Sequence, residues 1–271
     1  MTYLKLNAKK RLMNDTLKCF FVSILPFFVF SLCVVFNYYL PFFLKKTPIS
    51  KDIFLSVALS IFSIVLSFCL WKSVCLMKEK FFFMKTLYKK VKFFKVVRSI
   101  KFGRYITYLK VSVLRMLLAV SWSAVYFIPC IIVALLLIYS YRYENYGETA
   151  LLTLFVSSVM LFLVGAFHFF VTLKRYSMCE FIILTDKQKN PLKIMAESIR
   201  LMENHSVNYS FYCLSFTGWV LSCIFIVPLF YVLPFVNMSK WCYAKKITKQ
   251  ENTVNKNEKP IIFYIQKRKK A

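Results

Sequence analysis

Two histidines are the residues of this 271-residue chain best suited to carry a proton or to hold a ligand. His168 lies inside a long apolar run, where an imidazole that titrates near neutral pH could take either role. Such a histidine more often bonds to a neighbouring helix, and we favour that structural interpretation. His205 lies between Asn204 and Ser206, and no serine, aspartate or cysteine pattern identifies a nucleophile for it to activate.

The cysteines and carboxylates give no pattern that is typical of a reaction centre. Nine cysteines are scattered singly, and none forms a C-x-x-C pair. Metal sites need clustered Cys and His ligands, and disulfide frameworks need paired cysteines, so both are disfavoured. The first five apolar runs have no Asp or Glu in their central portions, which removes the carboxylates of a proton relay. We therefore predict no catalytic residue, no cofactor and no metal site.

Four serines in the second apolar run are spaced so that they share one face of a helix. Ser56, Ser60, Ser63 and Ser67 follow one another at intervals of four, three and four residues. Small residues in such a stripe let a second helix approach closely. The alternative is a polar pore lining, and packing is the more common use of a serine stripe.

The elements that must position these residues are long apolar helices. Hydrophobic residues make up 59% of the chain, and phenylalanine alone contributes 30 residues. A soluble domain is only about 45–50% apolar. A helix crosses the hydrocarbon of a bilayer in about 20 residues. Four runs therefore predict membrane spans, at residues 19–43, 53–76, 116–140 and 150–173.

Charge indicates how the last apolar stretch, 209–236, is used. Lysines and arginines that flank membrane spans stay in the cytoplasm. The chain contains 38 lysines and arginines and only 11 acidic residues. A turn near Pro228, which interrupts a helix, would divide the stretch into spans at 207–226 and 230–246. The cytoplasmic segments then hold 34 basic residues and the external loops hold four. Within the last span, Lys240 is costly unless it snorkels or faces protein.

These patterns together predict an all-α, multi-pass transmembrane bundle of about six spans. The membrane domain covers residues 1–246, and a basic cytoplasmic tail covers residues 247–271. We expect the protein to lie in a cell membrane, with both termini in the cytoplasm.

The first of two cytoplasmic segments with an amphipathic pattern follows the second span. It places apolar residues on one side of a helix and lysines on the other: Phe83, Met84, Leu87, Val91 and Phe94 against Lys78, Lys85, Lys89 and Lys92. A basic amphipathic helix suits an anionic leaflet. The four lysines are therefore the candidate contacts with lipid headgroups.

The second amphipathic segment precedes the fifth span. Asn190 can cap it and Pro191 can occupy its first turn. Its apolar side would hold Leu192, Met195, Ile199 and Met202, and its water-facing side Lys193, Glu197 and Arg200. We expect both segments to lie on the membrane surface.

Nucleic acid is the other partner that a basic chain suggests. Thirteen basic residues between Lys72 and Arg115 are interleaved with aromatics, as in some proteins that bind single strands. No glycine-rich or recognition motif accompanies them, and membrane topology already accounts for the charge. We predict no nucleic-acid partner.

The second half of the chain carries short motifs in a fixed order. They are Arg175-Tyr176-Ser177-Met178, Glu197-Ser198, Leu201-Met202-Glu203-Asn204-His205, Leu214-Ser215-Phe216-Thr217-Gly218-Trp219 and Leu233-Pro234-Phe235. This order resembles the Y-S-M, S-x-x-(L/M)-M-x-G-H, L-S-F-x-G-W and L-P-Y pattern of bacterial integral membrane proteins grouped as domain of unknown function 975. Asn204 stands where that pattern has glycine. The resemblance implies a helical protein of a bacterial cell membrane and brings no established activity.

We therefore expect a non-enzymatic integral membrane protein whose basic cytoplasmic face engages anionic lipid or a partner, either another protein or a second copy. The alternative is a small-solute or lipid-handling transporter, which six spans and a proline-broken last hairpin would suit. A deep cavity lined by Ser56, Ser63, Ser123, Ser158 and His168 would favour the transporter.

Overall fold

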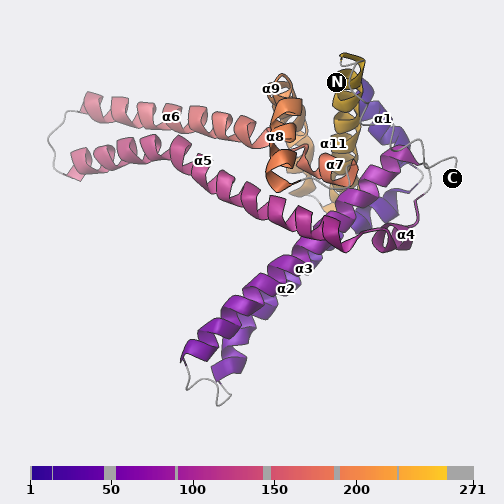
Figure 1. The fold of residues 1–271 in the computed structure, drawn as a ribbon. Helices are drawn as coiled ribbons and strands as arrows, with labels where there is room; N and C mark the ends of the chain where they lie inside the picture. The colour runs from indigo at the N-terminus through magenta and orange to yellow at the C-terminus, as the bar shows by residue number, and fades with distance from the viewer. Residues whose placement is uncertain are drawn as a thin grey trace. The chain divides into compact units, whose positions relative to one another are not determined.

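The computed structural model describes residues 2–13, 15–45, 53–88, 91–142, 148–185, 190–224 and 226–254, and within them it contains helices and no strands. The helices are α1 (Thr2–Leu12), α2 (Thr16–Lys45), α3 (Ile53–Leu87), α4 (Phe93–Arg98), α5 (Phe102–Arg142), α6 (Glu148–Lys174), α7 (Cys179–Thr185), α8 (Pro191–Met202), α9 (Ser206–Leu214), α10 (Thr217–Leu221), the 3₁₀ helix η2 (Ser222–Ile224) and α11 (Ile226–Val254), as Figure 1 shows.

The chain forms two compact units. The first contains residues Met1–Leu109, Glu180–Asn190 and Ser215–Ala271, and the second contains Lys110–Cys179 and Pro191–Leu214. Each unit holds one pair of long helices, α2 with α3 in the first and most of α5 with α6 in the second.

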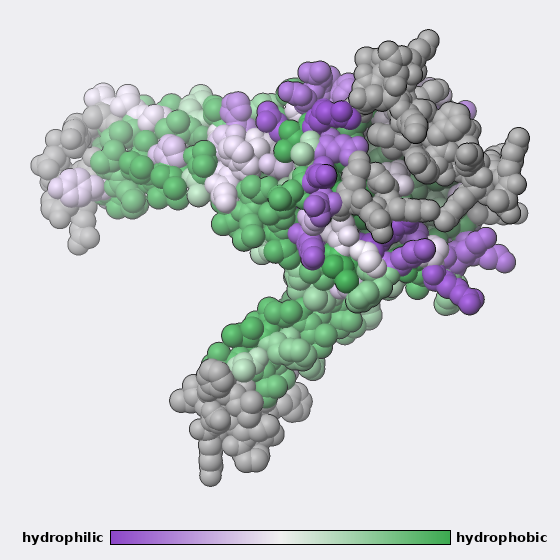
Figure 2. Space-filling view, viewed as in Figure 1, coloured by the Kyte–Doolittle hydropathy of each residue, from purple (hydrophilic) through white to green (hydrophobic). Residues whose placement is uncertain are grey.

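Four helices are long and apolar enough to cross a membrane: Thr16–Pro41, Ser56–Leu87, Phe102–Tyr139 and Leu151–Thr185. They confirm the four spans predicted from the apolar runs. Figure 2 shows hydrophobic side chains covering the surface of the α2–α3 hairpin, which is the surface a lipid bilayer requires. The protein is therefore a multi-pass helical membrane protein.

Two of these helices extend well beyond the spans predicted for them. α3 runs on to Leu87, and α5 begins at Phe102 and has 41 residues. At 1.5 Å per residue, 41 residues cover about 60 Å, twice the hydrocarbon thickness of about 30 Å. A helix need not end where the lipid ends, because its backbone hydrogen bonds are internal. The extensions carry charged residues out of the hydrocarbon.

In the first unit, α11 packs against α1, α2 and α3. Met238 and Trp241 are among its buried side chains, and Ala8 and Leu12 are buried in α1. The structure thus adds α1, a helix that the apolar pattern does not predict. α11 also continues past residue 246 to Val254, so the first eight residues of the predicted tail are helical. The rest of that tail lies outside the described residues.

The predicted fifth span over 207–226 is not a single helix. This stretch is divided into α9, α10 and η2. The break after α9 falls at Ser215-Phe216-Thr217-Gly218, where two hydroxyl residues and a glycine all have low helix propensity. The chain then enters α11, and Pro228 is the third residue of that helix, where a missing N–H costs no helical bond. Neither this stretch nor α11 is among the four membrane-length helices of the described residues.

The second amphipathic segment forms α8, beginning at Pro191 as predicted, but its buried face differs from the predicted one. Met195 and Met202 are buried as expected, whereas Leu192 is 70% exposed. Ser198 is buried instead, and its hydroxyl donates a hydrogen bond to the Arg175 carbonyl at 2.8 Å. The chain beside α8 decides which face is covered, and hydrophobicity alone does not report that. The position of α8 on a membrane surface stays a prediction.

Candidate functional site

The lysines predicted to meet lipid headgroups do not lie along one surface helix. Lys78 and Lys85 belong to the end of α3, and Lys92 precedes the separate helix α4. Lys92 is exposed to solvent. Lys89 lies outside the described residues. The prediction of a single amphipathic helix over these residues is wrong, because α3 continues straight out of the second span and ends at Leu87.

Lys85 is buried against protein rather than directed toward water. Its side chain is only 2% exposed, and its ammonium is paired with the Asp15 carboxylate, which lies just before α2. Arg11 donates a hydrogen bond to the Lys85 carbonyl at 3.2 Å. The hydrogen bond from Lys85 holds the pKa of Asp15 below its ordinary value of 3.8, with burial acting in the opposite direction. A paired, buried lysine is not available to a lipid headgroup.

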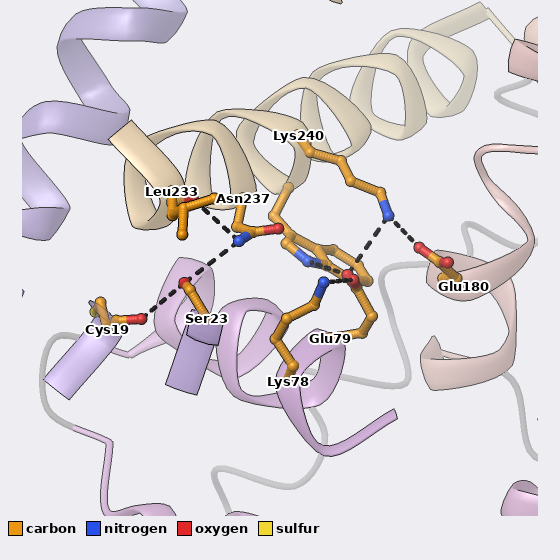
Figure 3. A network of polar contacts seen from close by, with 9 residues as sticks. Cys19, Ser23, Lys78, Glu79, Glu180, Leu233, Asn237 and Lys240 are labelled. Carbon is orange, nitrogen blue, oxygen red and sulfur yellow. Dashed lines mark hydrogen bonds and ion pairs between the residues drawn. The ribbon is translucent and has the colours of Figure 1, made fainter. Parts of the chain in front are cut away.

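A second, partly buried charge cluster joins α3, α7 and α11 (Figure 3). At its centre is Glu79, whose side chain is 6% exposed. Its Oε2 accepts a hydrogen bond from Trp241 Nε1 at 3.0 Å and lies 3.5 Å from Lys240 Nζ. Its Oε1 lies 3.1 Å from Lys78 Nζ. Lys240 is also paired with Glu180 on α7.

The cluster contains two ammonium groups and two carboxylates, so its charges balance. Burying a charge is costly unless it is paired and hydrogen-bonded, and each member here has a partner of opposite charge. Lys240 thus faces protein rather than snorkelling to the membrane surface, and this contact avoids the free-energy cost of placing an ammonium group in lipid. The arrangement can hold three helices together, although they are remote in the sequence.

An aromatic layer covers this cluster. The ring of Phe83 lies edge-on to Phe181 and Trp241, with centroid distances of 5.8 and 5.4 Å. Phe83 is one of the apolar residues predicted to touch the membrane from a surface helix, and it is buried within the first unit instead. Apolar rings beside an ion pair lower the local dielectric constant and so strengthen the pair.

The polar contacts continue toward the first hairpin (Figure 3). Asn237 on α11 donates to the Ser23 hydroxyl on α2 at 3.3 Å and to the Leu233 carbonyl at 3.0 Å. Ser23 in turn donates to the Cys19 carbonyl at 2.8 Å. These bonds fix α11 to α2 in addition to the charge cluster that fixes α11 to α3.

The serine stripe of the second span partly lines the contact between α2 and α3. Asn37 on α2 donates to the Ser67 hydroxyl at 2.8 Å and accepts from the Ser63 hydroxyl at 2.8 Å. Ser60 bonds instead to the Ser56 carbonyl of its own helix. These bonds to Asn37 support the packing interpretation for Ser63 and Ser67.

A cavity of about 310 Å³ lies in the first hairpin beside these bonds. Its lining includes Phe30, Asn37, Ser67 and Trp71 and is mainly apolar. The five residues expected in a transporter cavity do not line it: Ser56, Ser63, Ser123, Ser158 and His168.

His168 lies on α6 of the second hairpin and keeps an exposed side chain. Its ring is stacked on Tyr126 of α5, with a centroid distance of 6.2 Å and an interplanar angle of 14°. The Tyr126 hydroxyl is hydrogen-bonded to Thr172 at 3.1 Å. His205 lies in the turn between α8 and α9, where its carbonyl accepts from the Tyr209 amide at 2.8 Å. These contacts support the structural interpretation of His168.

Comparison with known proteins decides the family. The profile of the family described as Protein of unknown function (DUF975) matches residues 3–251. The chain belongs to this family. No curated protein and no solved structure matches it. The match extends far beyond the second-half motifs on which the resemblance rests, and it includes every helix of both hairpins.

Several of the DUF975 motifs contact one another in the fold. Ser198 of the second motif donates to the carbonyl of Arg175 in the first. Phe216 and Trp219 of the L-S-F-x-G-W motif pack on Phe235 of the last motif, with ring centroids 5.7 and 6.4 Å apart. These motif residues therefore join segments of the fold. The motifs do not include Glu79, Glu180 or Lys240, so they do not predict the charge cluster.

Proposed function

We propose that this DUF975 protein is a non-enzymatic protein of the bacterial cell membrane whose basic cytoplasmic face engages anionic lipid. The proposal rests on a difference between two groups of charged residues near the start of α2 and the end of α3: the acidic residues are paired, whereas many basic residues are exposed. Asp15, Glu79 and Glu180 are each paired with a lysine there. Further basic side chains remain exposed in α1 and around α4: Lys9, Lys10, Lys92, Lys95, Arg98 and Lys101.

The consequence is a positive surface at one end of membrane-spanning helices. α1 precedes α2, and α4 follows α3, so both short helices lie at the hairpin end where α2 begins and α3 ends (Figure 1). Each lysine or arginine near an anionic leaflet contributes about 1 kcal/mol of attraction. Several such residues together favour an anionic surface over a zwitterionic one by a large factor, and this attraction weakens as salt increases.

The lipid proposal is tested with the purified full-length protein in nanodiscs of phosphatidylcholine mixed with phosphatidylglycerol. Native mass spectrometry counts the lipids that remain bound after the disc is removed. We expect phosphatidylglycerol to be enriched over its share of the disc, and less so at high ionic strength. Equal retention of both lipids would overturn the proposal and favour a protein partner for the basic face.

The orientation is tested separately with a protease-cleavable tag placed after Ala271. We propose cytoplasmic N- and C-termini, since the positive-inside tendency favours the basic segments there. Protease should then reach the tag in inverted membrane vesicles and not in intact spheroplasts. Cleavage in spheroplasts would overturn this orientation.

A further inference from the structure

The connection between α3 and α5 presents two exposed phenylalanines among exposed basic residues. Phe94 is 86% exposed and Phe102 is 77% exposed. Four basic side chains around them are exposed as well: Lys92, Lys95, Arg98 and Lys101. We call these six residues the α4 patch. The chain has no Asp or Glu between Glu79 and Glu144, so none is available from this segment to neutralise the patch.

One side of α4 is attached to α3. Val96 is buried, and the ring of Phe93 packs against Phe81 with centroids 6.4 Å apart. Lys80 Nζ donates to the Ser99 carbonyl at 2.5 Å. Because these contacts fix one face of α4, its other face is held outward with Phe94, Lys95 and Arg98 on it.

The patch connects two membrane-length helices, so both of its ends are held by the membrane domain. α3 and α5, on either side, are both membrane-length helices, so the short connection between them starts and ends at helices that cross the lipid. Phenylalanine beside lysine and arginine is the composition by which amphipathic elements bind an anionic interface, with the ring below the headgroups and the charges level with phosphate.

We infer that the α4 patch is a binding site for anionic phospholipid. Phe94 and Phe102 enter the boundary between headgroups and acyl chains, and Lys92, Lys95, Arg98 and Lys101 contact the phosphates. This inference rests on the proposed function and names the surface that performs it. The α4 patch supplies the headgroup contacts in place of Lys78 and Lys85, which are paired with Glu79 and Asp15.

The test uses the full-length protein in nanodiscs that contain a small fraction of photoactivatable phosphatidylglycerol or, in parallel, photoactivatable phosphatidylcholine. After irradiation, peptide mass spectrometry locates the cross-links. We expect residues 91–102 to be labelled preferentially by phosphatidylglycerol. Replacing Lys95 and Arg98 by Gln together should lower the apparent affinity at this peptide about 25-fold, at roughly fivefold for each charge. Phe94→Ser should lower it about tenfold.

The matched control removes two exposed lysines of α8 and α11, with Lys193→Gln and Lys246→Gln together. It changes the net charge by the same amount and should leave labelling of residues 91–102 within about twofold. All variants alter exposed side chains, and an unchanged melting temperature checks that they fold. Enrichment of phosphatidylglycerol elsewhere, with the α4 patch unlabelled or insensitive to these changes, would overturn the α4 assignment and leave the proposed function standing. Absence of enrichment anywhere would overturn both.

Discussion

The two membrane hairpins have similar lengths and hydrophobicity, yet different contacts hold them together. In the α2–α3 hairpin, the amide of Asn37 bonds to Ser63 and Ser67, and ion pairs join its base to α7 and α11. In the α5–α6 hairpin, the helices meet at Gly165, where an added Cβ would lie 2.9 Å from the Tyr126 carbonyl oxygen. The first hairpin depends mainly on polar partners, whereas the second adds close approach and stacked rings to a hydrogen bond between Tyr126 and Thr172.

This difference indicates which substitutions each hairpin can tolerate. Lipid does not drive two apolar helices together, so helices in a membrane associate through small residues, hydrogen bonds and packing. A hairpin held by polar groups should be sensitive to loss of charge or of a hydrogen-bonding atom. A hairpin held by close packing should be sensitive to added volume. The following substitutions separate these two sensitivities.

The largest effect is expected from Glu79→Ala. It removes the carboxylate that Lys78, Lys240 and Trp241 share, and breaking one side of a buried ion pair costs about 3–5 kcal/mol. Glu79→Gln should cost less, because its amide oxygen can still accept from the indole. Reversible unfolding in mixed micelles gives the free energy of unfolding. Glu203→Ala, at an exposed glutamate of the second unit, is the control and should stay near wild type. A similar loss from all three would contradict the role of the cluster.

Gly165→Ala tests the second hairpin. The new methyl would clash with the backbone of α5 at Tyr126, and overpacking of this kind costs about 1–3 kcal/mol. Gly103→Ala is the matched control, since nothing lies within 4 Å of a Cβ there and alanine favours helix. Melting temperatures of the two variants should therefore move in opposite directions. A neutral Gly165→Ala would show that α5 and α6 are not in close contact.

Asn37→Ala tests the polar seam of the first hairpin. It removes two interhelical hydrogen bonds, each worth about 0.6 kcal/mol on average in membrane helices, so a loss of about 1 kcal/mol is expected. Asn208→Ala, at an exposed asparagine of α9, should have a smaller effect on the free energy of unfolding. Equal losses would mean that the seam adds nothing to the stability of the hairpin.

The smallest effect is the acid dependence of the Asp15–Lys85 pair, because Asp15 keeps 20% of its side chain exposed and water screens it. The pKa of Asp15 is lowered in the fold by its hydrogen bond to Lys85, so the unfolded chain takes up the proton first. The stabilisation is complete well above the ordinary pKa of 3.8 and is lost as pH falls through the lower folded value. Melting temperatures of wild type and Asp15→Asn should therefore differ near pH 6 and converge below pH 3.8. A difference that persists in acid would contradict this linkage.

Hydrophobic length was enough to predict the four membrane helices, because lipid requires each spanning segment to satisfy its own backbone groups. The break within 207–226 was not predicted, since its apolar length outweighed the weak helix formers at Ser215 and Gly218. The face of α8 was predicted only in part, because Leu192 and Ile194 are both apolar and the surrounding chain alone decides that Ile194 is the buried one.

Composition and the length of the apolar runs in this chain already specify a helical membrane protein. They do not specify which lysines are paired with carboxylates and which are exposed. Lys240 and Glu79 are 161 residues apart and meet only when α11 packs on α3. Lys85 and Lys95 carry the same charge ten residues apart, and one is buried against Asp15 while the other faces outward. Hydrophobicity is a property of single residues and their spacing, whereas the pairing of a buried charge depends on which helices come together in three dimensions.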